Sequence, residues 1–298
     1  MNPKVLVIGE SNVDLILYKR SGIIPRPGKE ILVDNCLLTI GSSSAIFACG
    51  IARLSGNPVF VSKVGNDAFG KFFVSELERK GVNTSLVKVV NNLRTGITVS
   101  LSTPKDRALV TFPGSIAGMT CRDIPKNVFS RALHLHMAAF FLQEKLRPHF
   151  ARIFRMAKQA GLTTSFDPAC DPEGKWNVRE VVKYVDILFL NEVEADGINL
   201  SALPKIPVLV IKHGKKGAGM VVSGKKYQAK APAGVKVVET TGAGDSFDAG
   251  FVYGFLKGFA PDDLLKFACA AGTLSTRGYG GTATQATIKE INKIMAFA

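Results

Sequence analysis

The chain has 298 residues, 46% of them hydrophobic, which suits a globular protein with one large core. Its formal net charge of +14 at pH 7 raises the question of nucleic acid, but the basic residues are dispersed and form neither a tail nor an Arg-rich helix. We therefore expect a basic surface that attracts small anionic substrates, and no nucleic-acid partner.

The sequence also carries signals on membrane insertion and on the redox state of its cysteines. No run approaches the roughly eighteen uncharged apolar residues that a membrane span needs, so we expect no membrane partner. The N-terminus leads directly into an apolar run at residues 5–8, without the cleavage region of a signal peptide. The five cysteines are scattered and form no C-x-x-C pair. The sequence therefore predicts a cytoplasmic protein without a disulfide framework or a zinc site.

Short apolar runs alternate with segments of helical period along most of the chain. In chain order, the sequence predicts a strand at 5–8, a helix at 44–54, a strand at 59–64, a helix at 69–80, a strand at 134–138, a helix at 148–160, a strand at 162–166, a helix at 178–184, and strands at 187–190 and 208–211. Short buried strands that alternate with helices are typical of an α/β fold with a central, mainly parallel sheet and helices on both faces.

Two regions interrupt this alternation. Residues 15–18 with 31–38, and 96–102 with 108–112, predict pairs of β-strands with no helix between them. We expect the two pairs to form one small sheet over the edge where ligands bind, a lid made by about residues 15–38 and 94–113. No internal repeat or long linker is present, so residues 1–298 are predicted to be a single domain with this lid.

The stretch E-T-T-G-A-G-D-S-F-D-A-G-F, residues 239–251, carries the clearest chemistry. Residues 235–238 before it look like the end of a strand. Residues 245–256 after its glycines carry phenylalanines at four-residue spacing, which predicts a helix. The glycine-rich turn would then lie at a helix N-terminus, where unpaired N–H groups and the helix dipole attract an anion.

This turn, Gly242, Ala243 and Gly244, is therefore a candidate anion hole, because glycines let the backbone approach an oxyanion closely. Asp245 follows it and is placed to accept a proton from a hydroxyl that attacks phosphorus. An anion hole beside a base is what phosphoryl transfer to an alcohol requires. The simpler interpretation is that Asp245 caps a helix after a tight turn. A dinucleotide-binding loop is excluded, since Phe247 occupies the position of its third glycine.

These residues resemble the C-terminal motif of the PfkB, or ribokinase-like, carbohydrate kinases, usually written D-T-x-G-A-G-D. Further matches follow in order over nearly the whole chain, at residues 9–14, 27–28, 41–45, 64–70, 81–82, 191–194 and 212–217. The resemblance implies a ribokinase-like fold and an ATP-dependent kinase that phosphorylates a hydroxyl of a sugar or sugar-like compound. It also implies that Asp245 is the general base and that the anion hole binds the transferred group.

The resemblance implies an acceptor site near the start of the chain. Asp14 lies just beyond a buried strand, where open α/β sheets bind ligands, although a solvated loop aspartate is the alternative. Gly41 and the serines after it supply a helix start with hydroxyls, which suits either capping or polyol recognition, and the resemblance favours recognition. The predicted acceptor residues are Asn12, Asp14, Gly41, Ser42, Ser43, Ser44 and Ala45.

The resemblance also implies a nucleotide site. Glu194 would orient the waters of a Mg²⁺ ion, whereas its simpler role is that of an acidic residue in the first turn of a helix. Lys212 and the glycines after it would hold the phosphates or ribose of ATP, and a basic surface hairpin is the alternative. The predicted cofactor-binding residues are Asn191, Lys212, Gly214, Gly217, Thr241 and Gly244.

Three positions depart from the family pattern. Glu239 stands where the family usually has Asp, near the site at which many members bind a monovalent cation such as K⁺. Ser42 replaces the second glycine of the usual pair. Ile46 occupies a position where many members carry a sugar-contacting Asn. Either the true acceptor presents no hydroxyl to Ile46, so that Ile46→Asn improves turnover of ribose or fructose, or Ile46 faces the core.

We therefore predict an ATP-dependent carbohydrate kinase with Mg²⁺, ATP and a small sugar or related polyol as its ligands. A nucleoside kinase of the same fold is the main alternative. A catalytically silent sugar-binding regulator is a third, which the retained Asp245 disfavours. By analogy with dimeric relatives, apolar residues of the lid predict a homodimer in which two lids pack together.

Overall fold

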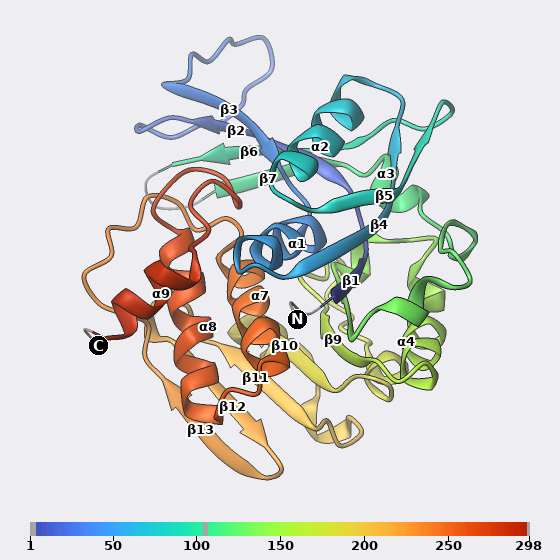
Figure 1. The fold of residues 1–298 in the computed structure, drawn as a ribbon. Helices are drawn as coiled ribbons and strands as arrows, with labels where there is room; N and C mark the ends of the chain where they lie inside the picture. The colour runs from blue at the N-terminus through green and yellow to red at the C-terminus, as the bar shows by residue number, and fades with distance from the viewer. Residues whose placement is uncertain (1–3, 104–106, 297–298) are drawn as a thin grey trace.

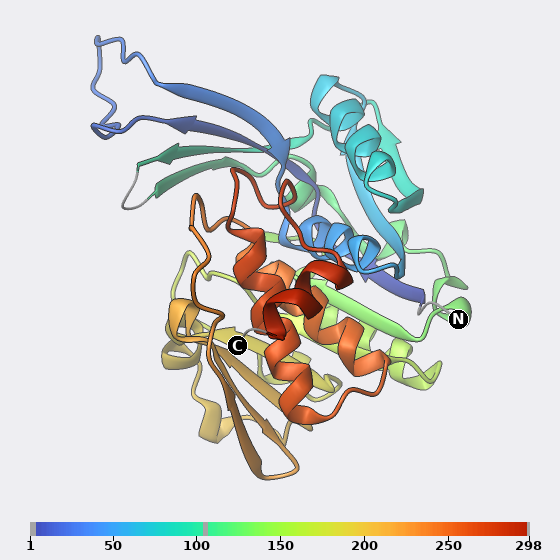
Figure 2. The same cartoon turned by 60° about the vertical axis from the view of Figure 1, so that its left-hand side comes forward.

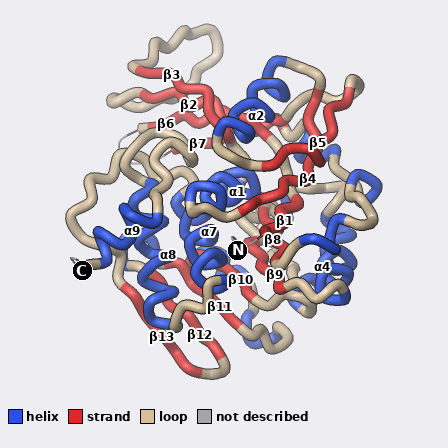
Figure 3. The backbone as a smooth tube through the Cα atoms, in the orientation of Figure 1, coloured by secondary structure: helices blue, strands red, loops and turns tan. Residues whose placement is uncertain are grey.

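The structure is a computed structural model that describes residues 4–103 and 107–296. The strands of its main sheet are β1 (Lys4–Ile8), β4 (Asn57–Gly65), β5 (Asn83–Val90), β8 (His134–Ala138), β9 (Thr163–Asp167), β10 (Ile187–Asn191), β11 (Val208–Lys212), β12 (Ala218–Val222) and β13 (Lys225–Ala229). They lie in the order β13-β12-β11-β10-β9-β8-β1-β4-β5 (Figures 1 and 3). The strands from β11 to β5 are mutually parallel, and β12 and β13 add an antiparallel edge.

Helices cover both faces of this sheet (Figures 1 and 2). They are α1 (Ser43–Arg53), α2 (Ala68–Arg79), α3 (Ser115–Gly118), α4 (Phe150–Gln159), α5 (Arg179–Val182), α6 (Glu192–Gly197), α7 (Ala243–Leu256), α8 (Pro261–Ser275) and α9 (Ile288–Met295). Successive residues of β1 point to opposite faces, so Val5 and Val7 join the core with α1, α7 and α8, and Leu6 and Ile8 join the core with α4 and α5. Within the described ranges no helix is long and apolar enough to cross a membrane.

A second sheet stands apart from the main one and consists of β2 (Asn12–Tyr18), β3 (Asn35–Ile40), β6 (Gly96–Ser102) and β7 (Arg107–Phe112), in the order β3-β2-β6-β7. It extends outward from the rest of the molecule in Figure 2. Only residues 9–11 separate β1 from β2, so the second sheet begins at the carboxyl edge of the main sheet. Its base is tied together by Ser115, whose hydroxyl donates to the Ser11 carbonyl (2.7 Å) and accepts from the Gly96 amide (2.9 Å).

The predicted fold class, a mainly parallel sheet covered on both faces with a small separate β-sheet, is confirmed. Two local predictions differ. Residues 235–238 are not a strand, because the Val238 amide donates to the Thr276 carbonyl at the end of α8 rather than to a neighbouring strand. Residues 31–34 lie outside β3, which starts at Asn35. That the second sheet acts as a lid, and that residues 1–298 form a single domain, remain predictions.

Candidate active site

The predicted anion hole lies at the N-terminus of α7. Gly242 caps the helix in the left-handed region, with φ 71°, and a Cβ added there would lie 2.6 Å from Gly281 Cα, so only glycine fits this turn. Gly244 is in the first turn of α7, where amides have no acceptor within the helix. The Ala243 amide instead donates to the Thr240 carbonyl at 3.2 Å. The helix dipole therefore directs its positive end at this turn.

Asp245 lies in the first turn of α7 and is half-buried. Burial raises the pKa of its carboxyl to about 8, and the Asp167 carboxylate adds to this, while Lys212 opposes it. The Ser43 hydroxyl, at the start of α1, lies near enough to Asp245 to act against this rise in pKa. The carboxyl group therefore titrates close to neutral pH, which is the range in which a general base works.

Two of the predicted acceptor residues meet on β2. The side-chain amide of Asn12 donates to Asp14 Oδ1 at 3.0 Å and to the Thr98 hydroxyl at 3.3 Å. A Cβ added at Gly41 would lie 2.2 Å from Asp14 Oδ1 and 2.4 Å from Asn12 Nδ2, so a side chain there would displace both groups. Burial raises the pKa of Asp14 to about 7, with Arg107 opposing and Glu239 adding to the shift.

The serines at the start of α1 divide into two groups. Ser42 and Ser44 contact Glu10, a buried carboxyl two residues after the end of β1, at 3.0 Å from Ser42 Oγ, 3.1 Å from the Ser44 amide and 2.6 Å from Ser44 Oγ. Ser42 also accepts from the Ala45 amide at 2.9 Å and so caps the helix. Burial raises the pKa of Glu10, against these hydrogen bonds. Of the three serines, Ser43 is the one whose hydroxyl acts on the pKa of Asp245. Glu10 was not among the site residues predicted from the sequence.

The predicted magnesium-associated residues contact each other at the start of α6. The Glu194 carboxylate accepts the Asn191 backbone amide at 2.8 Å and its side-chain amide at 2.7 Å, and Asn191 Oδ1 accepts the Glu194 amide at 2.9 Å. This is a capping box. Burial and the Asp167 carboxylate raise the pKa of Glu194 to about 7. Among the described residues, no group of three or more His, Cys, Asp or Glu is placed to hold a metal ion.

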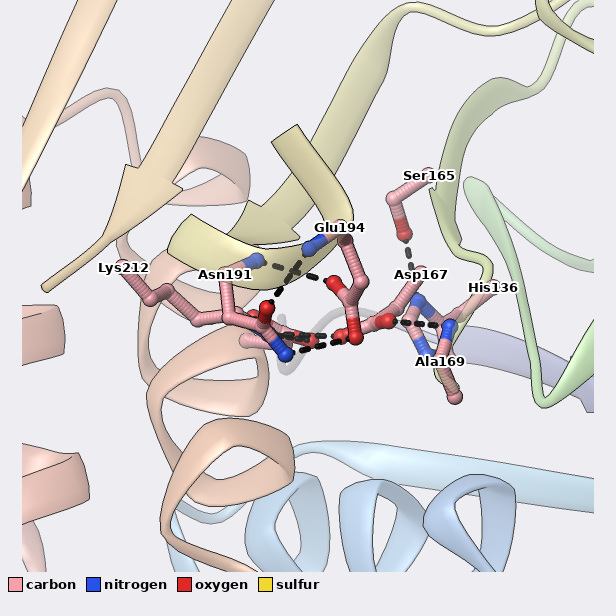
Figure 4. A network of polar contacts seen from close by, with 8 residues as sticks. His136, Ser165, Asp167, Ala169, Asn191, Glu194 and Lys212 are labelled. Carbon is pink, nitrogen blue, oxygen red and sulfur yellow. Dashed lines mark hydrogen bonds and ion pairs between the residues drawn. The ribbon is translucent and has the colours of Figure 1, made fainter. Parts of the chain in front are cut away.

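Lys212, at the end of β11, is held by two aspartates, one of which, Asp167, is labelled with it in Figure 4. Its ammonium group lies 2.6 Å from Asp167 Oδ2 and 3.1 Å from Asp248 Oδ1. Asp167 ends β9 and Asp248 lies on α7, so three elements meet at this cation. Neither aspartate was selected from the sequence.

Four of the predicted cofactor-binding residues, Lys212, Gly214, Gly217 and Gly244, line one cavity of about 560 Å³. Its wall is largely apolar and includes Val235, Val237 and Phe247. Cavities of this size and lining are typical of sites for small molecules and cofactors. The other two are neighbours of residues that line it: Asn191 on β10 is paired with Lys212 on β11, and Thr241 follows Thr240 in the chain.

Glu239 joins the second sheet to the anion hole. Its carboxylate accepts the amides of Thr241 (2.8 Å) and Gly280 (2.9 Å), and it pairs with the Arg107 guanidinium at 3.1 Å. Arg107, which begins β7, also donates to the Thr241 hydroxyl at 2.7 Å. The Glu239 carboxylate, which binds the backbone just before the anion hole, therefore forms an ion pair with Arg107 of the second sheet.

The fold and this edge define the class of protein. An open α/β sheet binds its ligand beyond the carboxyl ends of its parallel strands, and here Glu10, Asp167, Asn191 and Lys212 follow or end four such strands. The model of the pfkB family carbohydrate kinases matches residues 2–288. The chain therefore belongs to the pfkB family and is a carbohydrate kinase.

Individual relatives agree with this assignment. The chain is 28% identical to the probable fructokinase-5 of Arabidopsis thaliana, over 98% of this chain and 97% of that one. It resembles the solved structure of A. thaliana ribokinase complexed with ribose and ATP, with a TM-score of 0.83 and 24% identity over 100% of both chains. A putative ribokinase II from E. coli in complex with ATP and Mg²⁺ has a TM-score of 0.83 and 20% identity, again over 100% of both. At these identities the two structures establish the fold.

Proposed function

We propose that this chain transfers the γ-phosphoryl group of ATP to a hydroxyl of a sugar or sugar-like compound. The observation that carries the proposal is the position of Asp245 between two neighbourhoods. On one side Gly244 lines the 560 Å³ cavity, and on the other Ser43 connects Asp245 to the helix start behind Gly41. A base at this boundary lies where an acceptor hydroxyl and a terminal phosphate would meet.

In this proposal Asp245 accepts the proton of the attacking hydroxyl. Its pKa of about 8 keeps the carboxylate basic enough to take a proton and still partly ionised near neutral pH. The anion hole, Gly242, Ala243 and Gly244, stabilises the charge of the transferred group through backbone N–H groups at the positive end of α7, and the Ala243 amide shares its bond to the Thr240 carbonyl with that group. Asn12 and Asp14 form hydrogen bonds with hydroxyl groups of the acceptor sugar. The absence of a side chain at Gly41 leaves room for this sugar.

ATP would occupy the 560 Å³ cavity, with its base against the apolar wall and its phosphates toward Lys212 and Gly244. The A. thaliana ribokinase complex with ATP and the E. coli complex with ATP and Mg²⁺ support these cofactors. Mg²⁺, when bound, neutralises phosphate charge, and it binds through carboxylates, phosphates and several waters. Glu194 fits a role through water, because each of its oxygens accepts one hydrogen bond from Asn191 and keeps a lone pair for a second donor.

The test is an ADP-release assay over a panel of sugars, sugar acids and nucleosides, with MgATP as donor. Fructose and ribose enter the panel first, because the relatives are named fructokinase and ribokinase. Turnover of nucleosides alone would establish the nucleoside kinase, and binding of sugars without turnover would establish the silent regulator. The same panel in potassium-free buffer tests whether a monovalent cation takes part.

The variant Asp245→Asn tests the base directly. Asn keeps the size of the side chain and can still cap the helix, so we expect a folded protein that binds both substrates. Its kcat should fall by roughly a hundredfold or more, the scale for loss of general base catalysis. Near-normal turnover with a lowered melting temperature would instead show that Asp245 only caps α7.

A further inference from the structure

The cation beside the anion hole is held from three directions. Lys212 Nζ lies 2.6 Å from Asp167 Oδ2 and 3.1 and 3.2 Å from the two Asp248 oxygens. Both aspartates are buried, with exposures of 5% and 0%. Figure 4 shows Lys212 and Asp167 in the same polar network as Asn191 and Glu194. A lysine in this setting cannot change its position without leaving two buried carboxyl groups unpaired, which is costly.

The ammonium group also faces the anion hole. A Cβ added at Gly244 would lie 3.3 Å from Lys212 Nζ, and both residues line the 560 Å³ cavity. An ammonium group has three N–H bonds: one serves Asp167, and one can be shared by the two Asp248 oxygens, which lie at similar distances of 3.1 and 3.2 Å. The third is left for an oxygen of a group bound in the cavity.

The two aspartates that contact Lys212 differ in the direction of their pKa shifts. Burial opposes ionisation of Asp167, but Lys212 and a hydrogen bond from Asp248 outweigh it and lower the pKa of Asp167. Burial raises the pKa of Asp248 well above its usual range. The pKa shifts of the two aspartates are therefore opposite in direction, although both carboxyl groups contact the same ammonium group.

We propose that Asp248 and Asp167 are positioning residues for phosphoryl transfer, which act by holding the Lys212 ammonium beside Gly244 and against the terminal phosphate of ATP. This inference rests on the proposed function. Asp248 is three residues after Asp245 on α7, so one helix face carries both the proposed base and the group that orients the cation. The alternative role for the cluster is purely structural, as an ion pair that fastens β9, β11 and α7 together.

The two roles differ in what they do to the terminal phosphate. A positioning role makes the affinity for ATP exceed that for ADP, because only ATP carries the phosphate that Lys212 meets. We would measure kcat with the acceptor identified by the panel, and Kd for ATP and for ADP without acceptor. The variants are Lys212→Met, Asp248→Asn and Asp167→Asn, and the double variant Lys212→Met/Asp248→Asn.

Lys212→Met should lower kcat by roughly a hundredfold, the scale for one lost donor at a developing charge. Asp248→Asn and Asp167→Asn should each lower kcat by roughly tenfold to a hundredfold, since a shift of about 1 Å in a catalytic group costs this much. Both should reduce the preference for ATP over ADP and leave the KM of the acceptor unchanged. In the Lys212→Met background, Asp248→Asn should cause no further fall in kcat.

Asp123→Asn is the matched control, because Asp123 forms a similarly buried ion pair with Lys63 at 2.6 Å, outside the cluster. It should lower the melting temperature but leave kcat and the preference for ATP unchanged. If Asp248→Asn does not fold, Asp167→Asn tests the same contact from β9 instead of α7.

The inference is overturned if both aspartate variants keep the kcat and the ATP preference of the wild type, or if Asp248→Asn lowers kcat equally with and without Lys212. A wild type that binds MgATP but phosphorylates nothing in the panel refutes the proposed function, and the ATP preference of the variants then decides the inference alone. A wild type that does not bind ATP refutes both.

Discussion

At the scale of single residues, Ile46 illustrates how a departure from a family pattern is accommodated. Its side chain is 3% exposed and lies under the anion hole, with Cγ2 3.0 Å from the place of a Cβ on Gly242 and Cδ1 2.5 Å from that on Gly281. Ile46 therefore fills the space beneath two glycines. This burial favours the second of the two alternatives for Ile46, a residue that faces the core.

We accordingly expect Ile46→Asn to destabilise the protein and to improve no sugar. A buried amide without partners costs roughly 1–3 kcal/mol, and it would disturb the turn that Ile46 supports. Ile46→Val, which removes only a methylene, should cost about 0.5–1.5 kcal/mol and serves as the control. Thermal unfolding and kcat/KM for ribose and fructose measure both effects. A several-fold gain in kcat/KM for either sugar in Ile46→Asn would restore the acceptor role.

The residues of the candidate site fall into those that the sequence predicted and those that it could not. Lys212, Gly214, Gly217 and Gly244 could be predicted because each belongs to a short local motif, and they line one cavity. Asp167 and Asp248 could not, because their role comes from Lys212, which is 45 and 36 residues away. A charged residue at the carboxyl end of a buried strand was the available signal for Asp167, which ends β9, and for Glu10, which lies two residues after β1.

At the scale of elements, the strands of the main sheet that are buried on both faces were predictable, and its edge strands β5 and β13 were not. Residues of β10 are apolar almost without a break, and all five residues of β8 are buried, since helices cover both sides of these strands. The edge strand β13, with the sequence KKYQA, has exposed lysines, and β5 mixes polar and apolar residues. Polar edge strands resemble loops in sequence, because charged side chains there prevent pairing with other molecules.

The second sheet carries the prediction of a homodimer. Exposed apolar side chains gather on β7, where Leu109, Val110 and Phe112 are 57%, 61% and 49% exposed. A small sheet that exposes such residues gains stability by burying them against a second copy. We therefore expect a dimer formed through two second sheets. Light scattering should give twice the chain mass of 31.9 kDa, and Val110→Lys should return it to the monomer mass.

A wild type that stays monomeric both at assay concentration and at high concentration would contradict this dimer. Val193→Lys is a suitable control, because Val193 is as exposed, at 70%, but lies on α6 at the far end of the site. It should leave the mass unchanged.

At the scale of the whole molecule, two kinds of buried group set the response to pH. His134 and His136 share the Ser165 hydroxyl, each at 2.7 Å, and burial lowers the pKa of both, that of His136 to about 3. They stay neutral in the folded protein, so their unfavourable contribution to stability is gone once the pH exceeds their unfolded pKa of about 6.5. Above that pH the two histidines no longer change the stability, whereas carboxyl groups with raised pKa values do.

Asp14, Glu194 and Asp245 are such groups, with pKa values raised to about 7, 7 and 8. A carboxyl with a raised folded pKa contributes stability that is complete below its unfolded pKa and is lost as the pH rises through its folded pKa. The free energy of unfolding should therefore fall between pH 6.5 and 8. Urea unfolding across this window measures the fall, and Asp14→Asn should make it shallower. An unfolding free energy that rises across the window would contradict the assignment of these groups.

The arrangement at Ser115 has a mechanical consequence for the whole molecule. Its hydroxyl bonds to both Ser11 and Gly96, so the two parallel strands at the centre of the second sheet, β2 and β6, are fastened at the same end. Residues 9–11, which lead into β2, are buried and leave no loose joint there. The second sheet is thus held firmly at the end nearest the main sheet, while its other end extends outward. Any movement of the second sheet toward the site is therefore a gradual bend of its strands. The displacement of the backbone is smallest at Asn12 and largest near the distal ends of the strands.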